Sequence, residues 1–351
     1  MKRLFFYLTM IFLLLMGTTV QAKNPKKLKA LVVSGQNNHN WQVSHQVLKL
    51  ILDNSELFET DIVLTAPAGG DMSNFRPEFE RYDVVVLDYN GDRWPAETDA
   101  AFLKYVQGGG GVVIYHAADN AFAGWEEFNR IIALGGWEGR TEKSGPYYYL
   151  KDGKPVLDHT PGPGGSHGQQ REYPMHVRNT KHPIVKGLPD NWMHGRDEMY
   201  DRMRGPANIK DLLYSGYADA KTGGSGREEP LVFTVDYGKA HIFHIMLGHC
   251  GPTLAENPAM QCAGFQTLLL RGAEWAATGK VKQPVPSDFP TDKKRSFRMG
   301  YEFLNEALLD EMAEEAYQKG IILFEASQPK GGQTPVVMGA GGSGILLHEA
   351  I

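Results

Sequence analysis

Histidine side chains follow several short apolar runs of this sequence, at the points where buried strands would end. His116 comes directly after a β-branched run, His249 follows a second apolar run, and His39 lies in the polar stretch after the first one. Unperturbed imidazole titrates near neutral pH, which suits general acid/base chemistry. The turn at His116 offers no Cys or Ser, so the sequence favours imidazole chemistry over an acyl-enzyme mechanism.

Aromatic, amide and acidic side chains accompany these histidines. Trp41 follows His39, Asn90 follows another apolar run, and Asp119 lies three residues after His116. Ligands of open α/β sheets gather outside the carboxyl ends of the strands, so we expect these loops to share one crevice, a polar pocket with aromatic walls that suits a sugar. Each residue also has a structural reading: His39 as a solvated or capping residue, Trp41 as helix packing, Asp119 as a helix cap.

Short apolar runs alternate with helical patterns along most of the chain, which is typical of parallel strands joined by crossover helices. Strands are expected at 28–33, 60–64, 84–87, 111–116, 230–236 and 241–247. Helices are expected at 42–54, 97–106, 125–134 and 261–277. The segment 135–174, rich in Gly, Pro, Tyr and His, is interpreted as an ordered lid rather than a disordered loop.

Composition and charge exclude some classes of partner. Against 36 Lys and Arg stand 41 Asp and Glu, a formal net charge of -5, so we expect neither nucleic acid nor an anionic membrane surface as a partner. Residues 1–22 have the pattern of a cleaved secretory signal, which predicts a periplasmic or secreted protein with no stable membrane span after its removal. The two cysteines, Cys250 and Cys262, could pair or remain separate buried thiols.

Several motifs together resemble the ThuA-like, or trehalose utilisation, family over residues 28–281. They are His39-Asn40-Trp41, the run 109–137 that contains His116, the run 182–189, Asp197-Glu198-Met199-Tyr200, Glu229-Pro230 and Leu247-Gly248-His249. The resemblance implies a flavodoxin-like α/β fold, a three-layer parallel sheet similar to that of class I glutamine amidotransferases. It also implies no amidotransferase activity, because the cysteine nucleophile of that class is missing.

This resemblance implies a role in carbohydrate metabolism, with (3-keto) glucosides or disaccharides as the substrates. His116, His249 and Glu198 are then the expected catalytic residues, because a ketone acidifies the neighbouring C–H bond and one base and one acid could expel or rearrange the glycosidic oxygen. The expected substrate-binding residues are His39, Trp41, Asn90, Asp119, Trp125, His167, Tyr200 and Glu229.

Two alternatives stay open. The histidines and a carboxylate could hold a divalent metal ion, although their spacing in the sequence is too dispersed to establish one. The same pocket could also bind a sugar without transforming it, as a non-catalytic module. Whether the reaction is hydrolysis, elimination or isomerisation, and the oligomeric state, do not follow from the sequence.

The C-terminal part differs from the rest. After a linker at 282–297, residues 298–351 form a small appendage, of which 310–351 resemble part of a TldD-type metallopeptidase. In that family a His-Glu-x-x-x-His motif binds zinc, whereas here His348 and Glu349 are followed only by Ala350 and Ile351. Zinc normally needs three protein ligands plus water, so we interpret this segment as a truncated or fused piece and expect no peptidase activity.

Overall fold

A computed structural model describes residues 26–251 and 257–298 of the chain. The predicted signal segment and most of the C-terminal appendage, residues 299–351, lie outside the described residues. The described residues centre on one large mixed sheet in the order β2-β1-β3-β4-β13-β12-β11-β8-β9. No helix in residues 26–251 and 257–298 is long and apolar enough to cross a membrane.

The first half of this sheet is parallel. Its strands are β1 (Leu28–Ser34), β2 (Phe58–Leu64), β3 (Val84–Leu87), β4 (Gly111–Tyr115) and β13 (Ile242–Ile245). Three of them, β3, β4 and β13, are buried along their whole length, as expected of parallel strands covered on both faces. Because the five strands are parallel, their carboxyl ends lie at one edge of the sheet.

The second half of the sheet is antiparallel. Its strands are β12 (Arg227–Val235), β11 (Ile209–Ala218), β8 (Arg171–Val177) and β9 (Asn191–Asp197). A hairpin of β5 (Tyr147–Lys151) and β6 (Lys154–Asp158) pairs with β12, and β7 (Ser166–His167) pairs with β10 (Tyr200–Asp201). All of β5 to β12 lies between β4 and β13 in the chain, yet β4 and β13 are neighbours in the sheet.

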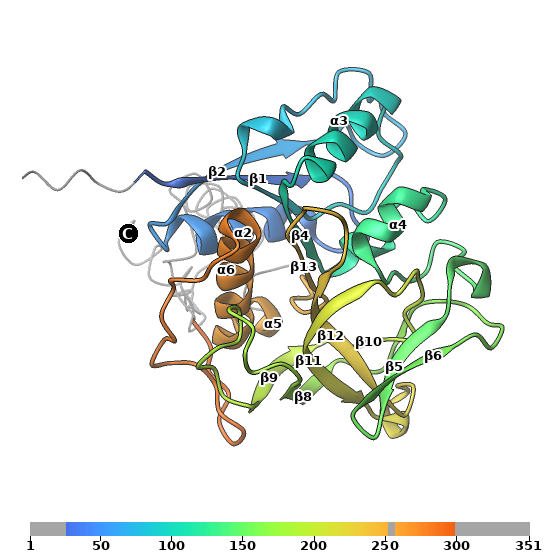
Figure 1. The fold of residues 1–351 in the computed structure, drawn as a ribbon, viewed down its shortest axis with the longest axis vertical. Helices are drawn as coiled ribbons and strands as arrows, with labels where there is room; N and C mark the ends of the chain where they lie inside the picture. Colours follow the sequence, from blue (N-terminus) through green and yellow to red (C-terminus); the bar gives the residue numbers. More distant parts are fainter. Residues whose placement is uncertain (1–25, 252–256, 299–351) are drawn as a thin grey trace, which may run out of the picture.

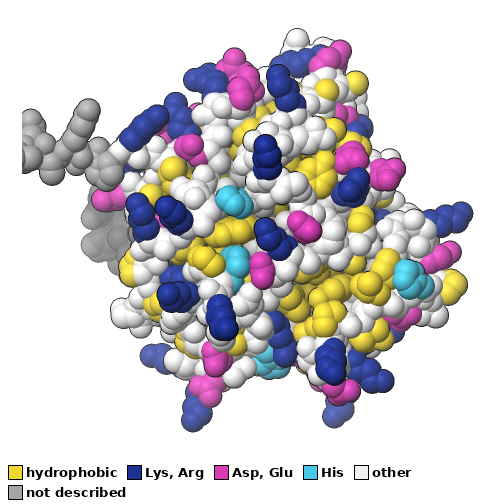
Figure 2. Space-filling model, viewed as in Figure 1, with side chains coloured by type: hydrophobic (Ala, Val, Ile, Leu, Met, Phe, Trp, Pro, Cys, Tyr) yellow, Lys and Arg dark blue, Asp and Glu magenta, His cyan; other side chains and the backbone are white. Residues whose placement is uncertain are grey.

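Helices cover both faces of the parallel half (Figure 1). On one side lie α2 (Trp41–Asp53), α5 (Pro258–Gln261) and α6 (Ala263–Thr278), and on the other lie α3 (Ala96–Gln107) and α4 (Glu126–Ile132). Four 3-10 turns complete the description: η1 (Phe79–Arg81), η2 (His116–Asn120), η3 (Glu142–Ser144) and η4 (Ala220–Thr222). On the face shown in Figure 2, basic and acidic side chains are interspersed.

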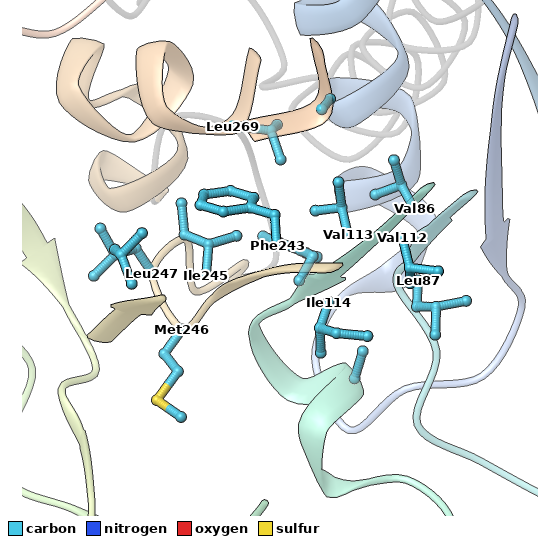
Figure 3. Packing of buried hydrophobic residues seen from close by; sticks show 14 of the residues in the cluster. Val86, Leu87, Val112, Val113, Ile114, Phe243, Ile245, Met246, Leu247 and Leu269 are labelled. Carbon is cyan, nitrogen blue, oxygen red and sulfur yellow. The ribbon is translucent and has the colours of Figure 1, made fainter. Parts of the chain in front are cut away.

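The central core lies between α6 and strands β4 and β13. Phe243 and Ile245 of β13 and Val113 of β4 point toward α6, where Leu269 meets them (Figure 3). Gly272 lets the helix come this close, because a Cβ there would lie 2.2 Å from the ring of Phe243. A tight contact of this kind fixes the distance between helix and sheet.

These elements confirm the expected α/β class. The helices and the parallel strands appear within a few residues of their predicted ranges. The segment 135–174 is more regular than the predicted lid, since it contains β5, β6, β7 and the start of β8. The antiparallel half was not predicted as such. Cys250 and Cys262 are both buried and free, which decides between the two readings of the cysteines.

Replacing Gly272 by Ala tests the α6 contact. Alanine would favour the helix by about 1 kcal/mol, but the clash with Phe243 should cost more, as overpacking does, so we expect a net loss of about 1–2 kcal/mol and a Tm lower by several degrees. Gly124→Ala is the control, because a Cβ there meets nothing within 4 Å. A Gly272→Ala protein that melts with the wild type would show that the contact does not constrain the helix.

Candidate metal centre at the edge of the sheet

Three histidines and one glutamate converge at the carboxyl edge of the parallel half. His39 follows β1, His116 follows β4, His249 follows β13, and Glu198 follows β9 of the antiparallel half. One ligand atom from each lies within 4.8 Å of all the others. We call these four residues the His–Glu cluster.

Glu198 lies at the centre of the His–Glu cluster. Its Oε2 atom is 3.3 Å from His249 Nδ1, 3.4 Å from His39 Nε2 and 3.8 Å from His116 Nε2. In a tetrahedral zinc site with bonds of about 2.0–2.1 Å, ligand atoms lie about 3.4 Å apart. The spacing is therefore close to what one metal ion would require.

His116 is held by a strained turn. It has a φ of 44°, in the left-handed region that few residues other than glycine adopt, and it opens the 3-10 turn η2 directly after β4. The side chain is almost fully buried, its Nδ1 lies 2.7 Å from the carbonyl of Met246, and Tyr200 stacks on its ring at 4.5 Å. The strained backbone and these contacts direct Nε2 toward Glu198.

The electrostatics of the cluster favour a cation between its members. With Nδ1 donating to the Met246 carbonyl, His116 Nε2 carries a lone pair, and this buried atom has no hydrogen-bond partner among the described residues. Burial, reinforced by nearby His39, lowers the pKa of His116 to about 3. Burial alone would raise the pKa of Glu198, but the close imidazole rings of His249 and His39 outweigh it and hold that pKa well below its usual range. A neutral imidazole lone pair thus faces a carboxylate.

His39 is oriented by a second layer of side chains. Its Nδ1 lies 3.3 Å from Asn37 Oδ1, and the amide of Asn37 donates to the carboxylate of Asp88 at 3.3 Å. Asp88 is buried at the end of β3 and also accepts a 2.6 Å bond from Ser44 of α2. Metal-binding histidines usually use their second nitrogen in such bonds, which fix the tautomer and the ring.

Asp197 holds the other two members of the cluster, Glu198 and His249, in position. Its buried carboxylate accepts bonds from the backbone N–H of Glu198 at 2.7 Å and of His249 at 3.1 Å. It also accepts 2.7 Å bonds from Gly248 N–H and from His194 Nε2. Sequence reasoning did not select Asp197 or His194, although Asp197 stands next to Glu198 in a motif that was quoted.

Gly248 is required by the turn that presents His249. Its φ is +103°, and a Cβ there would lie 2.6 Å from the ring of Phe265 and 2.8 Å from that of Tyr115. The carbonyl of Gly248 accepts a hydrogen bond from the Tyr115 hydroxyl. The turn after β13 is thereby held on both sides.

A partly exposed rim surrounds the cluster. His167 Nε2 lies 3.9 Å from Glu198 Oε1, and Gln170 donates to the same oxygen at 3.3 Å. The side chain of His167 is 40% exposed, compared with 2% for His116. Trp137 packs edge-on against Tyr200 at 4.8 Å. Of the five imidazole and carboxylate groups here, His167 is therefore the one most open to a ligand.

Three more predicted binding residues, Trp41, Asn90 and Trp125, line a separate cleft that adjoins the cluster. The structure does not bring the last two, Asp119 and Glu229, to the cluster. Asp119 is fully buried against His244 Nε2 at 3.1 Å, and Glu229 is buried on β12, where it accepts a 2.6 Å bond from Ser225. Their contacts are those of supporting residues.

The donor set fits a divalent transition-metal ion. Imidazole and carboxylate together are common ligands of zinc and iron, and an ion with five or six ligands keeps positions for water or substrate oxygens. Two of the histidines, His116 and His39, already use their second nitrogens in orienting contacts. The sequence left the metal open because its ligands come from four separate loops.

Comparisons with known proteins agree with this fold and identify the family. The model of the ThuA family, described as trehalose utilisation, matches residues 29–276, and the chain belongs to this family. A ThuA-like protein from Parabacteroides merdae is 64% identical, with a TM-score of 0.78 over 80% of this chain and 100% of that chain. A ThuA-like protein from Bacteroides uniformis is 21% identical, with a TM-score of 0.47 over 75% and 96%. No match was found among curated proteins.

The family match ends at residue 276, so it does not extend to the C-terminal appendage. The predicted TldD-like resemblance of residues 310–351 falls on a part of the chain that is not described.

Asp197→Asn tests the carboxylate that fastens the cluster. Either orientation of the new amide places its NH₂ group against buried N–H donors, so we expect the free energy of unfolding to fall by about 3 kcal/mol and metal affinity to fall roughly 10–100-fold. Denaturant titration and metal titration measure the two effects. Asp71→Asn, in an exposed turn with Ser73, is the control and should change stability by less than about 0.5 kcal/mol. Equal stability of Asp197→Asn and wild type would contradict the assigned role.

The buried Glu229 gives a pH-dependent stability. Burial raises its pKa to about 7, above the value of about 4.3 expected in the unfolded chain. Its contribution is therefore fully present below about pH 4.3 and is lost as pH rises through about 7. Glu229→Gln should flatten this fall in denaturation curves measured between pH 4.5 and 8, whereas replacement of the exposed Glu126 by Gln should not. An unchanged slope in Glu229→Gln would assign the pH dependence to another group.

Proposed function

We propose that this protein is a metal-dependent enzyme of carbohydrate metabolism, with a divalent ion held by His39, His116, Glu198 and His249. The observation that carries the proposal is the convergence of these four ligand atoms within 4.8 Å at the sheet edge. The membership of a family described by trehalose utilisation supports a carbohydrate substrate.

The geometry favours a ligand role for His116 over the acid/base role expected from the sequence. Its Nε2 faces Glu198 inside the buried cluster, and a pKa of about 3 makes it a weak base near neutral pH. A metal ion at this place would polarise a carbonyl or hydroxyl oxygen of the sugar. His167, at the partly exposed rim, is the histidine best placed to exchange a proton with a bound ligand.

We extend the proposal to (3-keto) glucosides and disaccharides as substrates. A ketone acidifies the adjacent C–H bond, so proton transfer by a rim histidine beside an electrophilic centre is sufficient chemistry for elimination or isomerisation. Export to the periplasm or the medium, expected from residues 1–22, belongs to the same proposal.

A second candidate is a non-catalytic sugar-binding module. It is favoured by the adjoining cleft, whose amide and aromatic lining would hold a sugar without any metal chemistry. Product analysis after incubation with glucosides and their 3-keto derivatives separates the two, since a binding module leaves every substrate intact.

Metal content and turnover of cluster variants test the proposal. We expect about one divalent ion per purified chain by elemental analysis, loss of turnover with a chelator, and a drop of roughly 10²-fold or more in His116→Ala and Glu198→Gln. Glu198→Gln preserves the shape of the side chain and guards against a folding defect. The exposed His159→Ala is the control. A protein that holds no metal, even after incubation with zinc, manganese or iron(II), would overturn the proposed centre.

A further inference from the structure

A second ligand site adjoins the His–Glu cluster. We propose that a cleft at the ends of β1, β3 and β4 binds the second unit of a neutral disaccharide or glycoside, while the reacting unit lies at the cluster. We call it the outer cleft, and its walls include Asn37, Asn38, Trp41, Asn90, Trp125 and Glu138. The inference rests on the proposed function, because it assigns the remainder of the same substrate.

The outer cleft and the cluster share one loop, the loop after β1. Asn37 lines the cleft and contacts His39 Nδ1 at 3.3 Å, and Trp41 follows His39 by two residues at the start of α2. The other walls come from the loops after β2, β3 and β4, which follow the same edge of the sheet. A ligand that extends from the cluster along this edge would therefore reach the cleft.

Two amide side chains in the lining of the outer cleft bridge its loops. The Asn90 amide donates to Asn38 Oδ1 at 2.9 Å and so joins the loops after β3 and β1. Within the described residues, Asn38 Nδ2 and Asn90 Oδ1 have no hydrogen-bond partner, which leaves an NH₂ group with two donors and one carbonyl acceptor for a ligand. Paired donors and acceptors of this kind match sugar hydroxyls, which both donate and accept.

Aromatic rings form the walls. Trp41 is half-buried, and its ring makes one tilted contact with His45 at 5.7 Å. Trp125 is rigidly held, with Arg93 over its ring at 3.8 Å and Phe128 stacked at 5.6 Å. Trp41 is thus the ring better placed to lie against the apolar face of a sugar, while Trp125 shapes the opposite part of the wall.

The charges of the outer cleft disfavour anionic ligands. Among the residues that the structure describes, the lining has one basic side chain, Arg93, which pairs with Asp99 at 2.6 Å. The other charged residues of the lining, Asp92 and Glu138, are acidic and exposed. A phosphorylated sugar or a nucleotide would meet negative charge without a free cation, whereas a neutral glycoside would not.

The size of the outer cleft suits an extended ligand. Its volume is about 1020 Å³, just above the range of about 300–1,000 Å³ found for small-molecule sites. The cluster itself is outside this lining, so the whole cleft is available to the part of the ligand that does not react. We therefore expect disaccharides to bind more tightly than monosaccharide glycosides.

Binding measurements with matched sugars test the inference. The probes are trehalose, methyl α-glucoside and the 3-keto derivative of each, titrated calorimetrically into the full chain. We expect trehalose or its 3-keto derivative, whichever binds more tightly, to bind about tenfold more tightly than the methyl α-glucoside in the same oxidation state. Trp41→Ala and Asn90→Ala should each reduce this ratio of affinities about fivefold or more. Asn90→Ala changes a loop residue outside α2, so it guards against a folding effect of Trp41→Ala. Tyr217→Ala, an exposed aromatic residue of β11, is the control and should leave the ratio unchanged.

Each outcome decides the question. A smaller ratio in both variants, with the control unchanged, supports the outer cleft as a subsite. Sugar binding by the wild type with no preference for the disaccharide, or with a ratio that either variant leaves unaltered, would overturn the subsite and leave the proposed function intact. Failure of the wild type to bind any of the four probes would overturn both.

Discussion

The arrangement of the site depends on one buried carboxylate, that of Asp197. It joins the end of β9, in the antiparallel half of the sheet, to the turn after β13, in the parallel half, through bonds to Glu198, Gly248, His249 and His194. A buried charge is stable only when its oxygens are satisfied, so the two halves have to meet at this point. That meeting brings the carboxylate of Glu198 to the histidines.

The route of the chain explains why two halves are needed. After His116 the chain leaves the parallel sheet, builds β5 to β12, and returns as β13 directly beside β4. His116 and His249 are adjacent because their strands are neighbours, and the excursion supplies Glu198 and the rim residue His167. The antiparallel half thus adds a second wall to a site whose first wall is the carboxyl edge of the parallel strands.

Several features of the site reduce the stability of the folded protein. His116 adopts a left-handed backbone, its Nε2 has no hydrogen-bond partner among the described residues, and Glu198 is a largely buried carboxylate. Strain and unsatisfied polar atoms persist where the surrounding structure over-determines them, and they gather at functional sites. A bound cation would offset the repulsion between these electron-rich atoms, which is why the cluster is more readily explained as a metal centre than as a set of independent acids and bases.

The sequence by itself determined the α/β class, the parallel strands and the three histidines at their ends, because burial on both faces leaves uniformly apolar runs and ligand residues follow them. Glu198, His167 and Tyr200 were found only through family motifs. The antiparallel half, the role of Asp197 and the separation of Asp119 and Glu229 from the cluster were decided by tertiary structure alone. Local patterns report which residues are buried, whereas the meeting of loops distant in the chain depends on strand order and on long-range hydrogen bonds that no local pattern encodes.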